Sequence, residues 1–188
     1  MTAMPVSGKT IMGIDPGTNL LGFGVIRVSG RTAEYVDMGV VDMRKEKSHF
    51  DKLRKLCMEM ERLLDTYSPD ELSVESPFYG KNPQVMLKLG RAQGAAITAA
   101  LRRGIPVSEY APREAKIAIT GVGSASKEQV STMIRKILNV DPGPEYLDAT
   151  DALALALCHY FHGISPLSQV KSSGSWEQFL QAHPERIK

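Results

Sequence analysis

The chain has few residues of the kinds that mark specialised protein classes. Its two cysteines, Cys57 and Cys158, are too few for a disulfide framework and lack the spacing of a zinc site. Both lie inside helical patterns beside apolar residues, so we expect two reduced thiols in the core. No apolar run is long enough to span a bilayer, and the N-terminus lacks an apolar signal region. These absences favour a cytoplasmic protein with no membrane partner.

Charge of one sign is also scarce. Lys and Arg number 23 against 21 Asp and Glu, so the net charge of +2 does not by itself indicate a nucleic-acid partner. A basic patch on one face remains compatible with that balance. The length of 188 residues fits one globular domain. We expect a disordered lead over residues 1–9, the domain over 10–162, and a C-terminal tail over 163–188 with one short helix at most.

The order of apolar patterns predicts the fold class. Three runs with strand character, separated by the Pro16–Asn19 turn and by Gly30, predict an antiparallel meander over residues 10–15, 20–29 and 32–43. Short strands at 72–75 and 105–110 then alternate with helical patterns at 50–64, 83–102, 112–120, 126–138 and 148–162. This order predicts an α/β fold in which a mixed central sheet, antiparallel meander plus parallel strands, is flanked by helices.

Four acids stand where strands end or helices begin. Asp15 follows an apolar strand and precedes Pro-Gly, Glu75 ends a second apolar strand, and Asp148 and Asp151 open the last helix. Each has an ordinary explanation as well: Asp15 suits a turn, Asp148 suits a helix cap, and Asp151 suits the first helical turn. Positions i and i+3 share one helix face, so Asp148 and Asp151 can both point at one spot. Other acids nearby are interpreted as solvated turn residues: Asp70, Glu71 and Asp141.

If the four carboxylates share one pocket, their repulsion has to be offset. A pair about 4 Å apart costs on the order of 4 kcal/mol at an effective dielectric constant of about 20. Divalent cations offset such repulsion, and a ligand set of oxygens alone favours Mg²⁺ or Mn²⁺ over zinc. Two such ions activate a water and stabilise the leaving oxygen in phosphoryl displacement. The set therefore predicts metal-assisted phosphodiester hydrolysis.

Three segments carry a family resemblance. Residues 13–18 (Gly-Ile-Asp-Pro-Gly-Thr), 74–82 (Val-Glu-Ser-Pro-Phe-Tyr-Gly-Lys-Asn) and 148–154 (Asp-Ala-Thr-Asp-Ala-Leu-Ala) closely resemble RuvC, the family of bacterial Holliday junction resolvases. The similarity covers roughly residues 10–162. It implies an RNase H-like fold, a homodimer, two Mg²⁺ ions per active site with Mn²⁺ as a substitute, and symmetric nicking of four-way junction DNA in recombination and repair. It also implies a RuvAB-type branch-migration motor as a partner. The resemblance makes Asp15, Glu75, Asp148 and Asp151 the catalytic, metal-binding residues.

Expected DNA contacts flank the acids. Phe78 and Tyr79 follow Glu75 in a loop bounded by Pro and Gly, where an exposed aromatic can stack on an unpaired base and a buried one anchors the loop. The family resemblance favours Phe78 as the outward ring. The nearby basic residues are Lys81, Lys88, Arg91, Arg113, Lys116 and Lys127, and most of them are interpreted as a solvated face. The resemblance favours Lys116 and Lys127 as phosphate contacts on the catalytic side, and Lys81 in the loop is a further expected DNA contact. Lys127 begins a helix, where positive charge is unfavourable unless an anion binds there.

The helix at 83–102 is rich in Gly and Ala. Small residues allow close packing, either on the protein's own sheet or against a second subunit, and only the resemblance favours the subunit contact. A two-fold dimer would present two identical sites to a two-fold-like junction.

Three other functions remain as alternatives. The Asp-Pro-Gly-Thr segment also resembles the phosphate-binding opening of actin-like ATPases and sugar kinases, which need two such domains around a nucleotide. A junction-binding module without activity would use the acids as caps, and four converging negative charges facing DNA argue against it. A general RNase H-type nuclease would cleave RNA–DNA hybrids as well as junctions.

Overall fold

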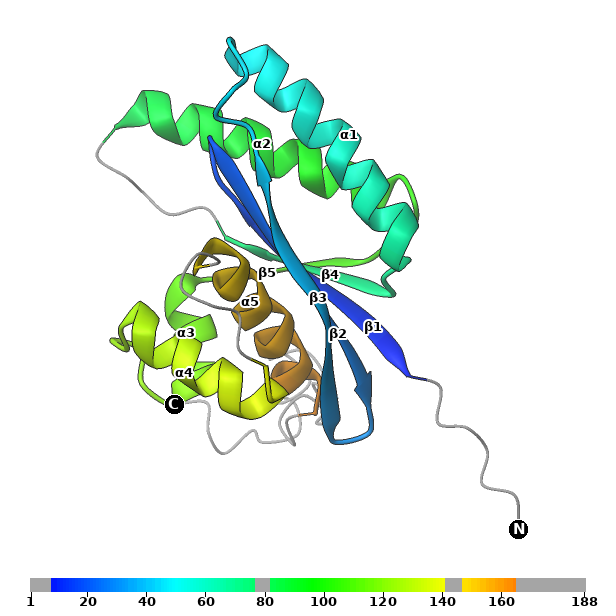
Figure 1. Ribbon diagram of the computed structural model, residues 1–188, viewed down its shortest axis with the longest axis vertical. Helices are drawn as coiled ribbons and strands as arrows, with labels where there is room; N and C mark the ends of the chain where they lie inside the picture. Colours follow the sequence, from blue (N-terminus) through cyan, green and yellow to red (C-terminus); the bar gives the residue numbers. More distant parts are fainter. Residues whose placement is uncertain (1–7, 77–81, 141–146, 165–188) are drawn as a thin grey trace, which may run out of the picture.

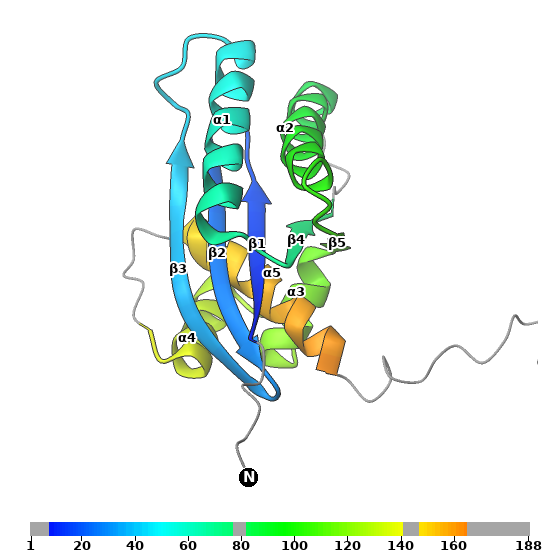
Figure 2. The same ribbon diagram turned by 90° about the vertical axis from the view of Figure 1, so that its right-hand side faces the viewer.

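The computed structural model describes residues 8–76, 82–140 and 147–164, which form three layers. Figures 1 and 2 show a central sheet with α1 and α2 on one face and α3, α4 and α5 on the other. The strand order is β3-β2-β1-β4-β5. The strands are β1 (Lys9–Pro16), β2 (Leu20–Ser29), β3 (Thr32–Asp42), β4 (Glu71–Glu75) and β5 (Val107–Tyr110). The helices are α1 (His49–Tyr67), α2 (Pro83–Leu101), α3 (Pro112–Thr120), α4 (Lys127–Leu138) and α5 (Leu147–Ile164).

The predicted mixed sheet is confirmed. Strands β1, β2 and β3 pair antiparallel as consecutive neighbours, whereas β4 pairs parallel with both β1 and β5. The expected division of the chain at residues 9 and 163 stays a prediction, because most of both terminal segments lies outside the described residues. Lys9, the last residue of the expected lead, already belongs to β1.

Alternation along β1 and β4 decides what each face of the sheet presents. Met12, Ile14, Leu72 and Val74 are fully buried in the core shared with α1 and α2. The intervening residues of both strands therefore face the layer of α3, α4 and α5, because successive side chains of a strand point to opposite faces. This places Asp15 and Glu75 on the α5 side.

Two glycines allow α5 to lie directly on the sheet. A Cβ atom on Gly13 would come within 2.0 Å of the Ala152 carbonyl oxygen, and one on Gly24 within 2.7 Å of the Leu153 backbone nitrogen. Only glycine fits at such backbone-to-backbone contacts. The close approach brings the first turns of α5 next to the end of β1.

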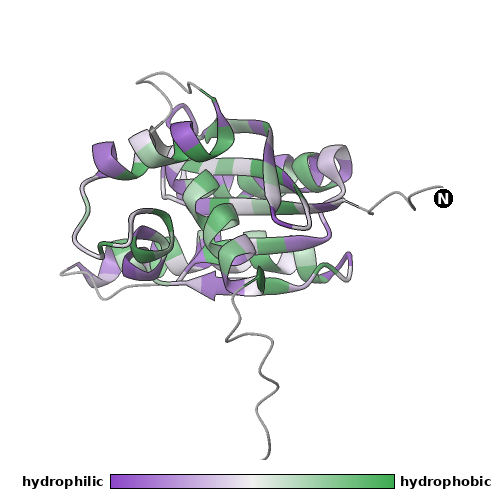
Figure 3. Ribbon diagram, turned by 90° about the horizontal axis from the view of Figure 1, so that it is seen from below, coloured by the Kyte–Doolittle hydropathy of each residue, from purple (hydrophilic) through white to green (hydrophobic). Residues whose placement is uncertain are grey.

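Figure 3 shows hydrophobic and hydrophilic residues mixed along the outer helices. Helix α5 is buried on nearly all sides from Ala149 to Tyr160. One core assignment from sequence is wrong: Cys158 is buried, but Cys57 is exposed. The buried stripe of α1 consists of Leu56, Met60, Leu63 and Leu64. Cys57 follows Leu56 directly and lies outside this stripe. In the described part of the chain, no helix is both long enough and apolar enough to cross a membrane.

Candidate active site

Three of the four predicted acids line one cavity. Asp15 of β1, Glu75 of β4 and Asp151 of α5 border a space of about 330 Å³, together with Lys116 of α3 and Lys127 of α4. Each of the three carboxylate side chains is partly buried. Five elements that are distant in sequence therefore contribute charged groups to a single site.

The register of the sheet explains why two of the acids meet. Ile14 pairs with Val74 in the parallel ladder between β1 and β4, so Asp15 and Glu75 follow directly at the carboxyl ends of neighbouring strands. The α2 helix supports this strand end, because Gln93 Nε2 donates a hydrogen bond of 2.9 Å to the backbone carbonyl of Glu75. Asp151 lies on the turn of α5 that packs directly against Gly13.

Burial and charge act together on Glu75. Desolvation, followed by the negative charges of Asp15 and Asp151, raises the pKa of Glu75 to about 7, against a smaller opposing effect of Lys127. The shift has the direction expected for a largely buried carboxylate beside two further carboxylates. It is also typical of functional sites.

Lys127 provides the positive charge closest to Asp151. Its Nζ atom donates to Asp151 Oδ2 at 2.5 Å. Lys127 is the first residue of α4, which begins with the predicted Ser126 cap: the Ser126 hydroxyl accepts from the Gln129 amide, and the Gln129 side chain accepts from the Ser126 amide. The carboxylate of Asp151 thus offsets the unfavourable position of a cation at a helix N-terminus.

The donor set suits a hard divalent cation, since it consists of carboxylate oxygens on separate, rigid elements. Within the described residues, however, no three His, Cys, Asp or Glu side chains are arranged to hold an ion as they stand. The ion pair between Lys127 and Asp151 accounts for part of this, because it directs Asp151 towards the ammonium group. The residues fit a metal by their chemistry and by the cavity that they share, and their side chains would have to turn to ligate one.

Comparison with known proteins identifies the family of the chain. The family model described as crossover junction endodeoxyribonuclease RuvC matches residues 11–159, which is most of the chain.

The chain belongs to the RuvC family.

Relatives within this family match over nearly their full length. The crossover junction endodeoxyribonuclease RuvC of Bacteroides fragilis is 49% identical over 98% of both chains. The RuvC of Porphyromonas gingivalis is 44% identical over 96% of this chain and 97% of its own. Among solved structures, Thermus thermophilus RuvC in complex with a Holliday junction substrate superposes with a TM-score of 0.77 at 33% identity, covering 82% of this chain and 94% of that one.

A more distant structure confirms the fold. The yeast mitochondrial Holliday junction resolvase superposes with a TM-score of 0.60 at only 13% identity, over 85% of this chain and 80% of that one. The RNase H-like architecture predicted for this RuvC-family chain is therefore confirmed.

The remaining predicted site residues fall into two groups. Phe78, Tyr79 and Lys81 lie outside the described residues, as does the side chain of Asp148. The backbone of Asp148 belongs to α5, which begins one residue earlier at Leu147, so Asp148 lies in the first turn and is not the residue before it. Lys116 and Lys127 both line the cavity, and their contact with a phosphate stays a prediction.

Sequence reasoning missed a polar network that fastens α5 to the sheet. His159 Nε2 lies 2.6 Å from Glu71 Oε2, and His159 Nδ1 lies 2.7 Å from the Tyr110 hydroxyl. Lys9 completes the network through an ion pair with Glu71. The interpretation of Glu71 as a solvated turn residue is wrong: it is half-buried in β4, and although burial opposes its ionisation, the hydrogen bonds from Lys9 and His159 outweigh burial and lower its pKa.

The spacing of this network matches the spacing of the acids. Glu71 and Glu75 are four residues apart on β4, about 13 Å at the rise of a strand. Asp151 and His159 are eight residues apart on α5, about 12 Å at the rise of a helix. Because the two spans agree, the contact between His159 and Glu71 at one end keeps Asp151 level with Glu75 at the other. The signal in the sequence was a histidine eight positions after an expected metal ligand on the same helix.

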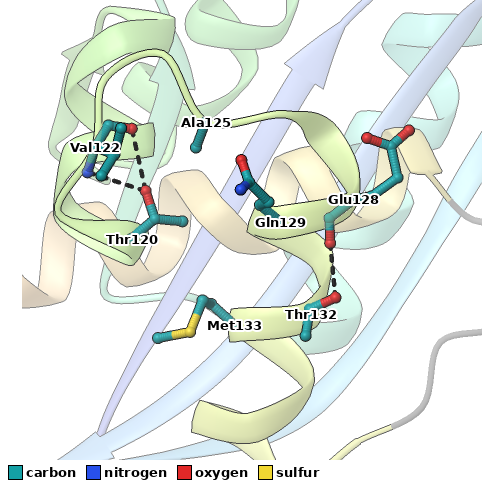
Figure 4. Close-up of a pocket in the computed structure, with 7 residues that line it drawn as sticks. All are labelled: Thr120, Val122, Ala125, Glu128, Gln129, Thr132 and Met133. Carbon is teal, nitrogen blue, oxygen red and sulfur yellow. Dashed lines mark hydrogen bonds between the residues drawn. The ribbon is translucent and has the colours of Figure 1, made fainter.

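A second cavity of this RuvC-family chain, of about 410 Å³, lies between α3 and α4. Figure 4 shows its lining, in which the Thr120 hydroxyl bonds the backbone of Val122 and the Thr132 hydroxyl bonds the carbonyl of Glu128. Glu128 is the one carboxylate among its lining residues Thr120, Val122, Ala125, Glu128, Gln129, Thr132 and Met133. A lone acid cannot supply the paired carboxylates of a two-metal site, which favours the cavity of Asp15 as the candidate active site.

Proposed function

We propose that this chain is a structure-selective endodeoxyribonuclease that resolves four-way DNA junctions by metal-dependent phosphodiester hydrolysis, in recombination and repair. The observation that carries the proposal is the shared cavity of Asp15, Glu75 and Asp151, flanked by two lysines, in a chain of the RuvC family. The solved complex of a relative with a Holliday junction supports junction DNA as the substrate.

Asp15, Glu75, Asp148 and Asp151 would hold the metal, and Mg²⁺ is the ion that suits an all-oxygen set, with Mn²⁺ as a substitute. Two bound ions would supply an activated water and stabilisation of the leaving oxygen. The protein's own contribution is to position the four acids on β1, β4 and α5. The raised pKa of Glu75 supports this role, because a cation would stabilise the ionised carboxylate that burial and the neighbouring acids disfavour.

Lys116 and Lys127 would contact the phosphate at the cleavage site. In the structure the ammonium of Lys127 is engaged by Asp151. Once a cation neutralises Asp151, the same ammonium, at the N-terminus of α4, is available to a substrate phosphate. Phe78, Tyr79 and Lys81 complete the proposed DNA contacts on the strength of the family resemblance alone.

A homodimer formed through α2 would give the paired nicks. One face of α2 packs on the protein itself through Ala92, Ala96, Ala99 and Ala100, which are buried. The opposite face presents Leu87 and Leu101, 60% and 58% exposed, at equal distances from the exposed Gly94. An antiparallel contact of two α2 helices across a two-fold axis near Gly94 would place Leu87 of one subunit against Leu101 of the other. The RuvAB-type motor remains a proposed partner by resemblance.

A labelled synthetic four-way junction incubated with the protein and Mg²⁺ tests the function. We expect nicks at opposed positions of two strands, with ligatable ends. Asp15→Asn should abolish cleavage and keep junction binding, because it removes a metal ligand and little else. Asp42→Asn is the matched control: Asp42 is a strand-end acid outside the cavity, paired with Arg44, and its loss should leave the rate unchanged.

The same assay separates this function from its alternatives. Equal cleavage of RNA–DNA hybrids and junctions would favour a general RNase H-type nuclease. Junction binding by the wild type without cleavage at any divalent ion would favour a binding module, and full activity of Asp15→Asn would remove Asp15 from the site.

A further inference from the structure

A third cavity of about 350 Å³ lies on the other side of the β1–β2 turn from the acids. It is bounded by residues of that turn and of the N-terminal parts of α1 and α2. Six of its eight polar lining residues carry the argument: Thr18, Asn19, Lys47, His49, Lys52 and Lys88.

The positive charge of this cavity is poorly compensated. Lys47 and Lys88 take part in none of the ion pairs among the described residues, and Lys52 donates to the neutral Asn19 amide oxygen at 2.5 Å. The acid in the lining, Glu46, is already paired with Lys55. Lysines close to helix N-termini are unfavourable unless an anion is present. Three cations with no carboxylate of their own therefore surround one polar space.

His49 provides an independent sign of a ligand-binding site. Its Nε2 atom is buried and has no hydrogen-bond partner within the part of the chain that the structure describes. Buried polar atoms are rarely left without a partner. Burial, then the positive charges of Arg91, Lys88 and Lys52, lower the pKa of His49, so the surroundings of the ring are electropositive. An anion in the cavity would offer Nε2 an acceptor and would neutralise the lysines.

The position of the cavity points to DNA. The turn that contributes Thr18 and Asn19 follows Asp15 directly, and Asn19 is four residues further along the chain. Four residues span at most about 14 Å, and the phosphates of one strand advance about 3.4 Å per nucleotide along a duplex. A strand that ran from a scissile phosphate at Asp15 towards the β1–β2 turn would therefore bring another phosphate within reach of the cavity, at most about four nucleotides away.

We propose that the cavity between the β1–β2 turn and the N-terminal ends of α1 and α2 binds a backbone phosphate of a DNA arm, outside the cleavage site, through Lys47, Lys52 and Lys88. The proposal rests on the proposed junction-cleaving function. Its role is to orient the arm that leaves the active site, with no part in bond breaking. The contact is to a phosphate, so it carries no sequence preference.

The test compares two double variants that remove equal charge. Lys52→Gln/Lys88→Gln removes two lysines of the cavity, whereas Lys45→Gln/Lys136→Gln removes two exposed lysines outside it. Binding of a labelled junction is measured against salt concentration in the Asp15→Asn background, which prevents cleavage. We expect the cavity variant to bind about tenfold more weakly at physiological salt and its salt slope to fall by about 1 to 2, with little change in the control.

Neutral methylphosphonate linkages locate the contacted phosphate. Placed one at a time within about four nucleotides of the scissile bond, one linkage should weaken wild-type binding and should not weaken the cavity variant further. The mass of each variant is measured as well, because Lys88 lies on α2 and a changed dimer would also alter binding. An unchanged mass with the expected loss supports the proposal.

Three results would overturn the proposal while the wild type still cleaves junctions. The first is equal loss of binding in both double variants. The second is additive loss between the cavity variant and every methylphosphonate position. The third combines two observations: the cavity variant binds the junction like the wild type, and inorganic phosphate raises the melting temperature of the wild type and of the control variant but not that of the cavity variant. This result would assign the cavity to a free anion. Failure of the wild type to cleave any junction would instead refute the proposed function.

Discussion

Replacement of Gly13 by alanine tests whether the contact between β1 and α5 assembles the site. The added Cβ would lie 2.0 Å from the Ala152 carbonyl oxygen and 2.8 Å from the Ala156 backbone nitrogen. Such contacts essentially never fall below 3.0 Å, so α5 must move away by at least about 1 Å. The neighbouring atoms are backbone, so no side-chain rotation can absorb the methyl group.

Two magnitudes follow from this displacement. Overpacking of a core typically costs 1–3 kcal/mol, and a backbone clash belongs at the upper end, so we expect about 3 kcal/mol. For a protein of this size that lowers the melting temperature by about 6–12 °C. Asp151 is the neighbour of Ala152 and moves with it, and a misplacement of about 1 Å costs about 100-fold in rate. We therefore expect cleavage to fall further than stability alone explains.

The assay combines thermal unfolding with single-turnover junction cleavage well below the melting temperature. Gly163→Ala is the control, because Gly163 lies near the end of the same helix α5, a Cβ there meets nothing within 4 Å, and alanine is favoured over glycine in a helix. It should melt at or slightly above the wild-type temperature and cleave normally. A Gly13→Ala protein that melts with the wild type, or that is destabilised yet cleaves at the wild-type rate, would refute the reasoning.

Three further predictions concern the site and its supports. The pKa of Glu75 in the folded protein, about 7, lies above the usual value of 4.5, so ionisation of Glu75 opposes folding. In metal-free buffer the free energy of unfolding should therefore fall by up to about 3 kcal/mol as the pH rises from about 4.5 to about 7. Glu75→Gln should remove this fall. A divalent ion should restore wild-type stability above pH 7 and leave Glu75→Gln unchanged, and denaturant titrations at several pH values would show whether either effect is missing. His159→Ala should cost about 2 kcal/mol and raise the Mg²⁺ concentration needed for cleavage, with partial rescue by His159→Gln; an unchanged metal dependence would reduce His159 to a packing residue. Gly94→Glu should yield a monomer in light scattering, whereas Thr66→Glu on exposed α1 should not, and an intact dimer in both would remove α2 from the interface.

Much of the architecture could be predicted from local patterns. Helix α3 begins at Pro112 and ends at Thr120 as expected, and β2 spans Leu20–Ser29 as expected. These elements follow the period of their own apolar residues and the turn residues at their ends. The patterns were less informative at the edge of the apolar stripe of α1. The helical spacing of apolar residues over 50–64 includes Phe50 and Cys57, yet Cys57 is exposed and Phe50 is 75% exposed. A difference of one position, about 100° around a helix, is decided by the neighbour that covers it.

The candidate site, too, could be predicted only in part from the sequence. The motifs identified Asp15, Glu75 and Asp151, because acids at strand ends and helix starts are visible along the chain. The network of His159, Glu71 and Tyr110 was not predicted, since each of these residues has an ordinary explanation on its own element. The role of the network is visible only in three dimensions, where eight residues of α5 span about the same length as four residues of β4.

The amino-acid sequence by itself determined the order of strands and helices, the acids proposed to carry the chemistry and the family to which the chain is similar, because these depend on residue type and on spacing along the chain. Only the tertiary structure decided which charges share a cavity, how Lys127 is paired, and that lysines from three separate segments surround one polar space at the N-terminal ends of α1 and α2. The physical reason is that electrostatic interactions and desolvation depend on distances through space, and those distances are set by the parallel register of β1 with β4 and by the close contact of α5 with Gly13.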